Sequence, residues 1–241
     1  MKRIIDITLS AAGLICFGPL LLPIMFLVWK QDHFSPFYIA PRVGKDEKMF
    51  SMVKLRSMVK GADKTGVDST SSNDQRITPV GHFIRKYKLD EIMQLWNVLI
   101  GNMSLVGPRP NVKRETDLYT PIEKRLLTVK PGITDIASII FSDENEILKD
   151  SKNPDLDYNQ LIRPWKSRLG LLYIQNRSLL IDLYLILLTA VSIVSRKISL
   201  MGVNRLLVYL QAPENVIQVS RREQKLVPYP PPGSDTIVSE R

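Results

Sequence analysis

Cysteine and histidine are scarce in this 241-residue chain, which has one cysteine, Cys16, and two histidines. A single cysteine cannot form an internal disulfide, and so few residues cannot supply the Cys/His clusters that bind zinc. Both a disulfide-stapled secreted domain and a zinc-binding domain are therefore excluded. Aromatic residues make up only 7% of the chain, which disfavours the base-stacking platforms of nucleic-acid-binding proteins. We expect no nucleic-acid partner.

Positive charge exceeds negative charge, because 33 Lys and Arg residues stand against 24 Asp and Glu residues, a formal net charge of +9. A surplus of this size indicates an anionic partner, such as nucleic acid, a phosphate-bearing substrate or an acidic lipid surface. The length suits one sizeable domain with a short appendage, and it is too small for two full hydrophobic cores.

Residues 4–29 form an almost uninterrupted apolar run. Three interpretations compete for this run. A signal peptide has a shorter apolar stretch and a small-residue cleavage site, which residues 28–31 do not provide. A membrane-crossing helix fits by length, because about 26 residues at about 1.5 Å each exceed the roughly 30 Å hydrocarbon core. The third is a re-entrant helix, which enters and leaves the membrane on the same side.

Two prolines inside the run, Pro19 and Pro23, favour the re-entrant interpretation, because proline removes a helical N–H and clashes with the preceding turn. The part before them, residues 4–18, is about 22 Å long as a helix and too short to cross alone. Lysines flank both ends of the run, and positive charge marks the cytoplasmic side. The sequence therefore predicts a helix-break-helix membrane segment over residues 1–30, with a crossing helix as the alternative.

Short β-favouring runs and longer helical patterns follow the apolar run. Residues 31–58 alternate β-favouring segments with proline and glycine turns, and the polar residues 61–76 predict a mobile loop. We expect an α+β fold that is mostly helical, with a small β element. The apolar spacing predicts helices that follow Thr78 and that cover residues 89–99, 114–128 and 179–194.

Two adjacent carboxylates, Asp90 and Glu91, begin an amphipathic helical pattern and follow a group of cations. Neighbouring residues on a helix point about 100° apart, so the pair suits two separate roles better than a shared proton. One carboxylate can attack phosphorus, while the other can hold Mg²⁺, which prefers hard oxygen ligands. The ordinary alternative is a solvated pair in the first turn of a helix, where acidic residues are favourable.

Three further cations lie in segments whose local sequence fixes the direction of the side chain or the backbone. Lys54 and Arg56 are two residues apart in a β-favouring segment, so their side chains point to the same side. Arg109 lies between Pro108 and Pro110, which restrict its backbone. Its guanidinium matches phosphate oxygens by paired hydrogen bonds. Each cation taken singly has the alternative of an ordinary surface charge.

Five segments resemble motifs of the bacterial sugar transferases, the monotopic phosphoglycosyl transferases that initiate surface glycans. The segments occur in the order of the family, and the likeness covers roughly residues 1–195. They are Lys54–Met58, Lys88–Glu91, Gln94–Leu99, Gly101–Pro110 and Lys130–Thr134.

The resemblance implies a transferase in the cytoplasmic leaflet of the bacterial inner membrane. Such enzymes move a sugar-1-phosphate from a UDP-sugar to undecaprenyl phosphate and release UMP, as the first membrane step of surface glycan synthesis. By motif position, Asp90 would be the nucleophile that forms a phosphosugar-aspartate, and Glu91 would contact Mg²⁺, the expected cofactor. The residues expected to bind phosphate or nucleotide are Lys54, Arg56, Arg85 and Arg109.

Residues 31–198 would then be a cytosolic, membrane-associated catalytic domain. Residues 199–241 would be a C-terminal extension, without a counterpart in the smallest members of the family. The proline-rich residues 228–232 and a polar tip predict that this extension is partly disordered. Further expected partners are inner-membrane lipid and a second copy of the chain in a homodimer.

The chain departs from the family pattern after Thr134. Asp135 and the residues after it replace the usual Gly-Trp-Ala-Gln run, and residues 142–146 stand in place of the downstream Asn-Gly-Arg. The donor preference of better-known members therefore does not carry over. The rival hypothesis from another class is a non-catalytic membrane adaptor, basic in order to bind acidic lipid, in which Asp90 and Glu91 are merely solvated.

Overall fold

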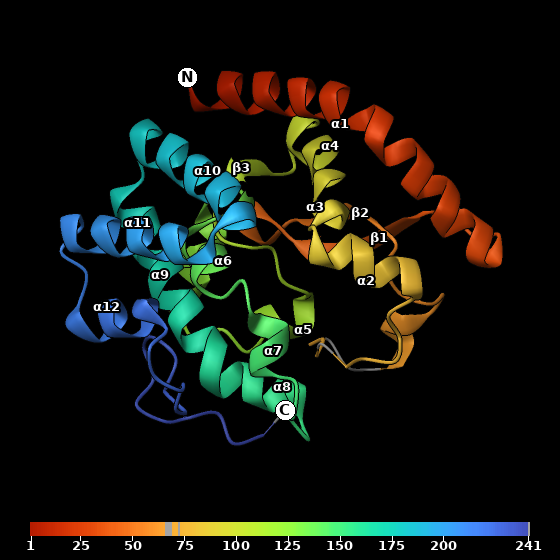
Figure 1. The fold of residues 1–241 in the computed structure, drawn as a ribbon. Coiled ribbons are helices and arrows are strands. Elements are labelled where there is room, and N and C mark those ends of the chain that lie inside the picture. Colours follow the sequence, from red (N-terminus) through yellow and green to blue (C-terminus); the bar gives the residue numbers. More distant parts are fainter. Residues whose placement is uncertain (66–68, 72, 241) are drawn as a thin grey trace.

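A long N-terminal helix, α1 (Lys2–Asp32), lies along one side of a body of short strands and helices in the computed structural model (Figure 1). The structure describes residues 1–65, 69–71 and 73–240. The main helices of the body are α2 (Pro79–Lys86), α3 (Leu89–Ile92), α4 (Gln94–Leu99), α5 (Lys113–Thr116), α6 (Ile136–Ile140), α7 (Glu144–Ile147), α8 (Pro154–Asp157), α9 (Arg163–Asn176), α10 (Leu179–Val194), α11 (Arg196–Tyr209) and α12 (Glu214–Arg221). Short 3-10 segments are η1 (Lys45–Glu47), η2 (Ala62–Thr65) and η3 (Glu123–Thr128), and a π-helical turn, η4 (Tyr158–Ile162), leads into α9.

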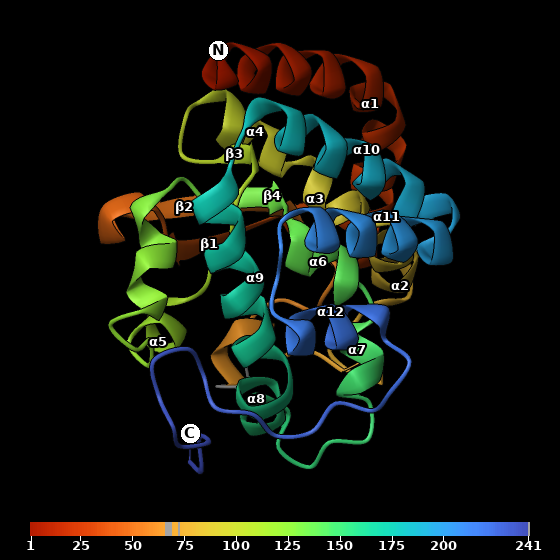
Figure 2. The same ribbon diagram turned by 90° about the vertical axis from the view of Figure 1, so that its left-hand side faces the viewer.

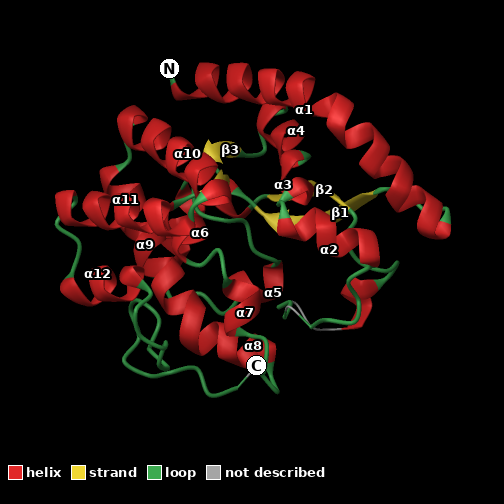
Figure 3. Cartoon of the chain, in the orientation of Figure 1, coloured by secondary structure: helices red, strands yellow, loops and turns green. Residues whose placement is uncertain are grey.

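Two small strand pairs lie among the helices (Figure 3). β1 (Phe37–Val43) and β2 (Met49–Leu55) form an antiparallel hairpin in which Val43 pairs with Met49. β3 (Ser104–Val106) and β4 (Gly132–Thr134) are parallel. The prediction of a mostly helical chain with a small β element is therefore confirmed. The hairpin carries Lys54 on β2, and the parallel pair supports the loop that contains Arg109.

Helix α1 contains both prolines, Pro19 and Pro23, inside one continuous 31-residue helix. The helix bends in its course rather than separating into two helices with a gap between them (Figure 1). It is the one helix of the described residues that is long and apolar enough to cross a membrane. Whether it is re-entrant or crossing stays a prediction. Much of its apolar surface is exposed, including Ile15 and Leu22.

Polar contacts fasten the start of α1 to the body. The ammonium of Lys2 lies 2.5 Å from Asp182 Oδ2 on α10. The carboxylate of Asp6 is buried and accepts hydrogen bonds from Ser104 Oγ at 2.9 Å and from the Leu105 amide at 3.1 Å. Because a buried carboxylate is stable only with such donors, the first turns of α1 are part of the folded body.

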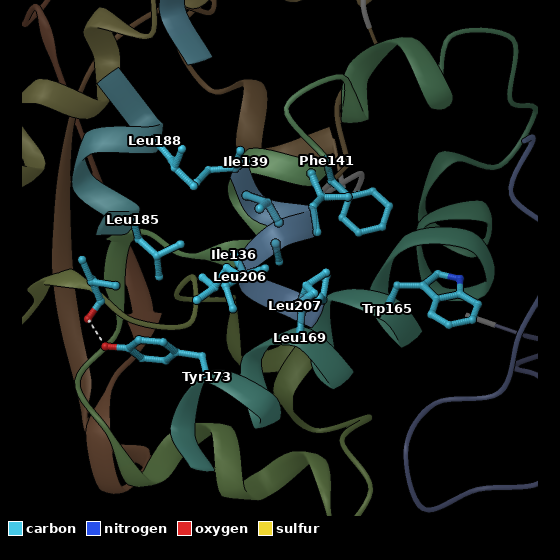
Figure 4. Packing of buried hydrophobic residues seen from close by; sticks show 14 of the residues in the cluster. Ile136, Ile139, Phe141, Trp165, Leu169, Tyr173, Leu185, Leu188, Leu206 and Leu207 are labelled. Atoms are coloured by element: carbon cyan, nitrogen blue, oxygen red, sulfur yellow. Dashed lines mark hydrogen bonds between the residues drawn. The ribbon is translucent and has the colours of Figure 1, made fainter. Parts of the chain in front are cut away.

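The main hydrophobic core lies where α6, α9, α10 and α11 meet (Figure 4). Ile136, Leu169, Leu185 and Leu207 come from these four helices and are almost completely buried. A second, smaller cluster joins α1 to α2 and β2 through Val28, Ile84 and Leu55 and their neighbours. The β2–α3 region is thus fixed between the two clusters.

The C-terminal residues contribute to the main core. Val203 and Leu207 on α11, together with Val216 and Ile217 on α12, are buried in it. The predicted boundary at residue 199 consequently falls inside α11. The described part of residues 222–240 has no helix or strand beyond the end of α12, and it runs along the outside of the body (Figure 2). The division of the chain into three parts and the disorder of its end stay predictions.

Helix boundaries follow local chemistry. Thr78 caps α2, because its hydroxyl accepts a hydrogen bond from the Gly81 amide at 3.0 Å, and Pro79 takes the first helical position as predicted. The predicted helix over residues 179–194 is α10. The prediction of one helix over residues 114–128 is wrong, since only α5 and η3 form there. Pro121 lies between them and disfavours a helical residue before it.

Two other predictions from the sequence differ in detail from the structure. The helix predicted over residues 89–99 is divided into α3 and α4 at Met93. The loop predicted over residues 61–76 contains η2 at its start. Residues 66–68 and 72 of that loop lie outside the described part of the chain.

We expect Gly132→Ala to destabilise the body strongly. A Cβ at this position would lie 2.1 Å from the backbone nitrogen of Gly107 on the neighbouring strand segment. Backbone cannot move aside as a flexible side chain can, so we expect a cost of about 3 kcal/mol or more. Denaturant unfolding in detergent measures this loss.

Gly18→Ala is the matched control, because nothing lies within 4 Å of its Cβ position. This substitution should leave the free energy of unfolding unchanged. Equal stability of the two variants would contradict the prediction.

Candidate active site

The two adjacent carboxylates lie in the first turn of α3. Lys88, with a φ of 53°, provides the turn that begins this helix. Asp90 is buried and Glu91 is partly buried. Helix α3 packs against β2 and against α1 and α2, so the backbone that carries the carboxylates is held on several sides.

Lys54 on β2 faces Asp90. Its ammonium lies 3.5 Å from Asp90 Oδ2, and the exposed fractions of the two side chains are 18% and 12%. Burial lowers the pKa of Lys54, while the charge of Asp90 opposes this change. A long contact of this kind balances the carboxylate charge without enclosing both of its oxygens. Asp90 therefore has a cation beside one of its two oxygens.

Arg109 holds Glu91. The guanidinium nitrogen Nη2 donates a hydrogen bond of 2.7 Å to Glu91 Oε1. Burial alone raises the pKa of Glu91, but the charges of Arg109, Lys54 and Lys88 outweigh it and lower the pKa to about 2. The negative charge of Glu91 raises the pKa of Arg109 in turn. Both groups therefore stay charged at neutral pH.

Arg85 and Lys88 complete the group of cations. Burial lowers the pKa of both, and the carboxylates of Asp90 and Glu91 act in the opposite direction. The structure thus brings together the two predicted catalytic carboxylates, three of the four cations predicted to bind phosphate or nucleotide, and one cation, Lys88, for which no role was predicted. This cluster of Lys54, Arg85, Lys88, Asp90, Glu91 and Arg109 is called the acid–base cluster below.

Arg56 lies elsewhere. Its guanidinium donates hydrogen bonds to both oxygens of Asp32 at the end of α1, at 2.5 and 2.7 Å, and to the Ser35 carbonyl at 2.8 Å. These contacts occupy the group and indicate that it anchors the end of α1 to β2. Its predicted role in binding phosphate or nucleotide stays a prediction.

A cavity adjoins Arg109. Its polar lining includes Arg109, Asp135, Tyr158 and Lys166. Asp135 caps α6 through a 2.6 Å hydrogen bond from the Ser138 amide, and burial raises its pKa. Sequence reasoning assigned no role to Lys166, and it noted Asp135 only as a departure from the family pattern. That departure was the available signal that this wall differs from other members.

Comparison with known proteins tests the family resemblance that the motifs indicate. Residues 1–196 match the family model described as bacterial sugar transferase. The chain belongs to this family. It is 32% identical over 203 residues to the exopolysaccharide production protein ExoY of Sinorhizobium fredii, an alignment that covers 78% of the chain and 83% of that protein. The resemblance stated from the motifs is therefore confirmed.

Longer members of the bacterial sugar transferase family are similar over part of their length. The UDP-galactose-lipid carrier transferase of Erwinia amylovora is 37% identical over 149 residues, which cover 56% of the chain and 31% of that protein. The UDP-glucose:undecaprenyl-phosphate glucose-1-phosphate transferase of Klebsiella pneumoniae is 34% identical over 192 residues, 78% of the chain and 39% of that protein. The chain thus spans about a third of the length of such relatives, 31% in the Erwinia case. The apolar α1 and the family together indicate a membrane protein.

The acid–base cluster offers oxygen ligands that Mg²⁺ could use together with a phosphate compound. No group of three or more His, Cys, Asp or Glu side chains that could enclose a metal occurs among the residues described. Mg²⁺ commonly binds through one or two carboxylates together with phosphate oxygens of the substrate. Arg109 takes only Oε1 of Glu91, which leaves Oε2 and the carboxylate of Asp90 as hard oxygen ligands. The donor set therefore fits a cation that arrives with a phosphate compound.

The ion pair between Glu91 and Arg109 predicts a stability that depends on acid pH. The pKa of Glu91 is lowered to about 2 in the folded protein, whereas an unfolded glutamate titrates near 4.3. The pair therefore contributes its full stabilisation above about pH 4.3, and this contribution is lost as the pH falls toward 2. The difference in Tm between the wild type and Glu91→Gln should stay constant from pH 7 to 5 and narrow between pH 4 and 3.

An exposed glutamate provides the control for this titration. Glu146 has an exposed side-chain fraction of 62% and only a 3.7 Å contact with Lys149. Glu146→Gln should change the Tm little at any pH, because surface ion pairs contribute little. A Tm difference for Glu91→Gln that is as large at pH 3 as at pH 7 would contradict the assigned ion pair.

Proposed function

We propose that this protein transfers a sugar-1-phosphate from a UDP-sugar to undecaprenyl phosphate and releases UMP, at the first membrane step of surface glycan synthesis. The observation that carries the proposal is a buried carboxylate, Asp90, with Lys54 beside it and the Glu91–Arg109 pair next to it in the same helical turn. Family membership and the names of the Erwinia and Klebsiella relatives support the two substrates.

The reaction proceeds in two displacements at phosphorus. An oxygen of Asp90 attacks the phosphorus that bears the sugar, the bond from this phosphorus to the UMP oxygen breaks, and a phosphosugar-aspartate forms. An oxygen of undecaprenyl phosphate then attacks the same phosphorus and releases the Asp90 carboxylate. One phosphate site therefore serves two very different substrates in turn.

The surrounding side chains lower the barrier of both displacements by balancing charge. Lys54, Arg85 and Lys88 place positive charge where the departing phosphate oxygens develop negative charge. Arg109 orients Glu91 through their hydrogen bond. Mg²⁺ held by the carboxylate oxygens supplies further neutralisation of the diphosphate when bound.

The attachment of α1 supports a location on the cytoplasmic face of the inner membrane. Its start is bound to the body through Lys2 and Asp182, and its end is bound to the same body through Asp32 and Arg56. A straight crossing would place these two ends about 30 Å apart on opposite sides of the hydrocarbon core. The basic surplus of the chain favours an anionic lipid surface. A re-entrant α1 thus belongs to the proposal.

A donor panel tests the proposed function. The purified full chain in nanodiscs receives undecaprenyl phosphate, Mg²⁺ and UDP-glucose, UDP-galactose or UDP-N-acetylgalactosamine, and the release of UMP is measured. We expect at least one donor to give repeated turnover, with more UMP released than enzyme present. This turnover should occur only when undecaprenyl phosphate is present. Absence of UMP with every UDP-sugar would reject the proposal and favour the membrane adaptor.

A further inference from the structure

The C-terminal part of the chain lies outside the residues that match the family. The match ends at residue 196, and α11, α12 and residues 222–240 follow it. These residues pack on the body beside α8 and α9 (Figure 2). Their contacts include residues next in sequence to Lys166 and Glu144, and Lys166 lines the cavity that adjoins Arg109.

Arg222 makes the inward contact of this part of the chain. It ends α12 in a left-handed conformation with a φ of 56°, and only 10% of its side chain is exposed. Its Nη2 lies 3.2 Å from Asp143 Oδ2, an oxygen that Arg196 Nη2 also contacts at 2.9 Å. Its guanidinium lies 5.5 Å from the centre of the Phe141 ring. Its Nε and Nη1 are buried without a hydrogen-bond partner among the residues described. A buried guanidinium with unmade hydrogen bonds is costly, so stability alone is a poor explanation for its presence.

The residue after Asp143 connects this contact to the cavity. Glu144 begins α7 directly after Asp143, and its carboxylate forms an ion pair with Lys166 on α9. Lys166 lines the cavity together with Arg109. Glu144 on α7 and Lys166 on α9 also affect the acid–base cluster electrostatically. Glu144 raises the pKa of Arg109, and Lys166 lowers the pKa of Lys88.

The end of the chain also covers α9 on both sides of Lys166. The ring of Tyr229 lies 4.4 Å from the ring of Trp165, centre to centre. Arg168 donates a 2.9 Å hydrogen bond to the Pro230 carbonyl. Residues 229–230 therefore cover α9 at Trp165 and Arg168, close in sequence to Lys166.

We propose that Lys166 is a further binding residue for the diphosphate of the UDP-sugar, and that Arg222 is a positioning residue that holds it through Asp143 and Glu144. This inference rests on the proposed function, because it names an additional cation of the same site. The ammonium has three N–H donors, and Glu144 engages it from one side. Lys166 lines the same cavity as Arg109, and its ammonium lies 5.3 Å from the centre of the Tyr158 ring, which leaves N–H donors for a phosphate bound there.

The test compares two adjacent arginines. Arg222→Gln removes the contact with Asp143, whereas Arg221→Gln removes the same charge from an exposed neighbouring position. We expect Arg222→Gln and Lys166→Gln each to weaken the binding of UDP, measured by calorimetry, about tenfold. With the most active donor of the panel, each should raise KM about tenfold with a smaller change in kcat. Arg221→Gln should behave as the wild type, and Arg222→Lys should recover part of the loss.

Two further readouts separate positioning from general loss of structure. Hydrogen exchange of residues 142–168 should increase in Arg222→Gln and stay unchanged in Arg221→Gln. The double variant Arg222→Gln/Lys166→Gln should bind UDP no more weakly than Lys166→Gln alone, because both changes act through one ammonium. Unchanged UDP affinity in Arg222→Gln, or fully additive losses in the double variant, would overturn the inference. UDP binding and exchange need no turnover, so they decide the inference even if no donor yields UMP, an outcome that would reject the proposed function separately.

Discussion

Asp90→Asn should reduce the release of UMP at least about a thousandfold, because an amide is not a nucleophile toward phosphorus. Asparagine has the shape of aspartate, so the packing of α3 is preserved and the protein should still fold. The binding of UDP, measured by calorimetry, should change far less than turnover does. Without acceptor, the wild type should gain the mass of a sugar-1-phosphate on the peptide that contains Asp90, and the variant should gain none.

A carboxylate remote from the acid–base cluster is the matched control for this substitution. Asp117 is exposed and pairs with Lys113 on the surface, so Asp117→Asn should turn over as the wild type does. Turnover of Asp90→Asn near the level of Asp117→Asn would remove Asp90 from the role of nucleophile. A sugar-1-phosphate found on a different carboxylate would do the same and would name the replacement.

Arg109→Ala should lower kcat/KM by about a hundredfold, a loss typical of removing one donor that stabilises transition-state charge. The change removes a cation from the acid–base cluster and also leaves Glu91 without its 2.7 Å partner. Arg109→Lys should recover part of this loss, because a lysine keeps the charge and loses the planar fork that matches phosphate oxygens. Steady-state kinetics with the most active UDP-sugar measure both variants.

A double-mutant cycle with Glu91→Gln tests whether Arg109 acts through Glu91. If the hydrogen bond between them matters, the double variant Arg109→Ala/Glu91→Gln should lose much less activity than the two single losses combined. Additive losses would show that Arg109 and Glu91 act independently. Wild-type kcat/KM in Arg109→Ala would exclude Arg109 from the site.

Much of the acid–base cluster could be predicted because its residues occupy short segments with strong local chemistry. Asp90 and Glu91 are adjacent in the sequence, and Lys54 lies in a strand whose alternation sets its direction. The cap at Thr78 and the apolar period of residues 179–194 likewise indicated their helices directly. In these cases a few neighbouring residues determine the outcome.

Other features depend on contacts between distant parts of the chain. Two-residue spacing places Arg56 on the same side of β2 as Lys54, yet the end of α1 takes its guanidinium through Asp32. Lys166 reaches the cavity only because α9 packs beside the loop of Arg109. The division of residues 89–99 at Met93 depends on how α3 and α4 pack against the body. No short segment carries this information.

The first turns of α1 have a consequence for protein engineering. Lys2 and Asp6 are bound by α10 and β3, and Arg3 donates hydrogen bonds of 2.5 and 2.8 Å to carbonyls at the end of α4. The hydrophobic anchor is therefore not an interchangeable module. A chimaera that replaces residues 1–32 with the anchor of an unrelated protein would expose unmatched polar groups on the catalytic body, even if it reached the bilayer.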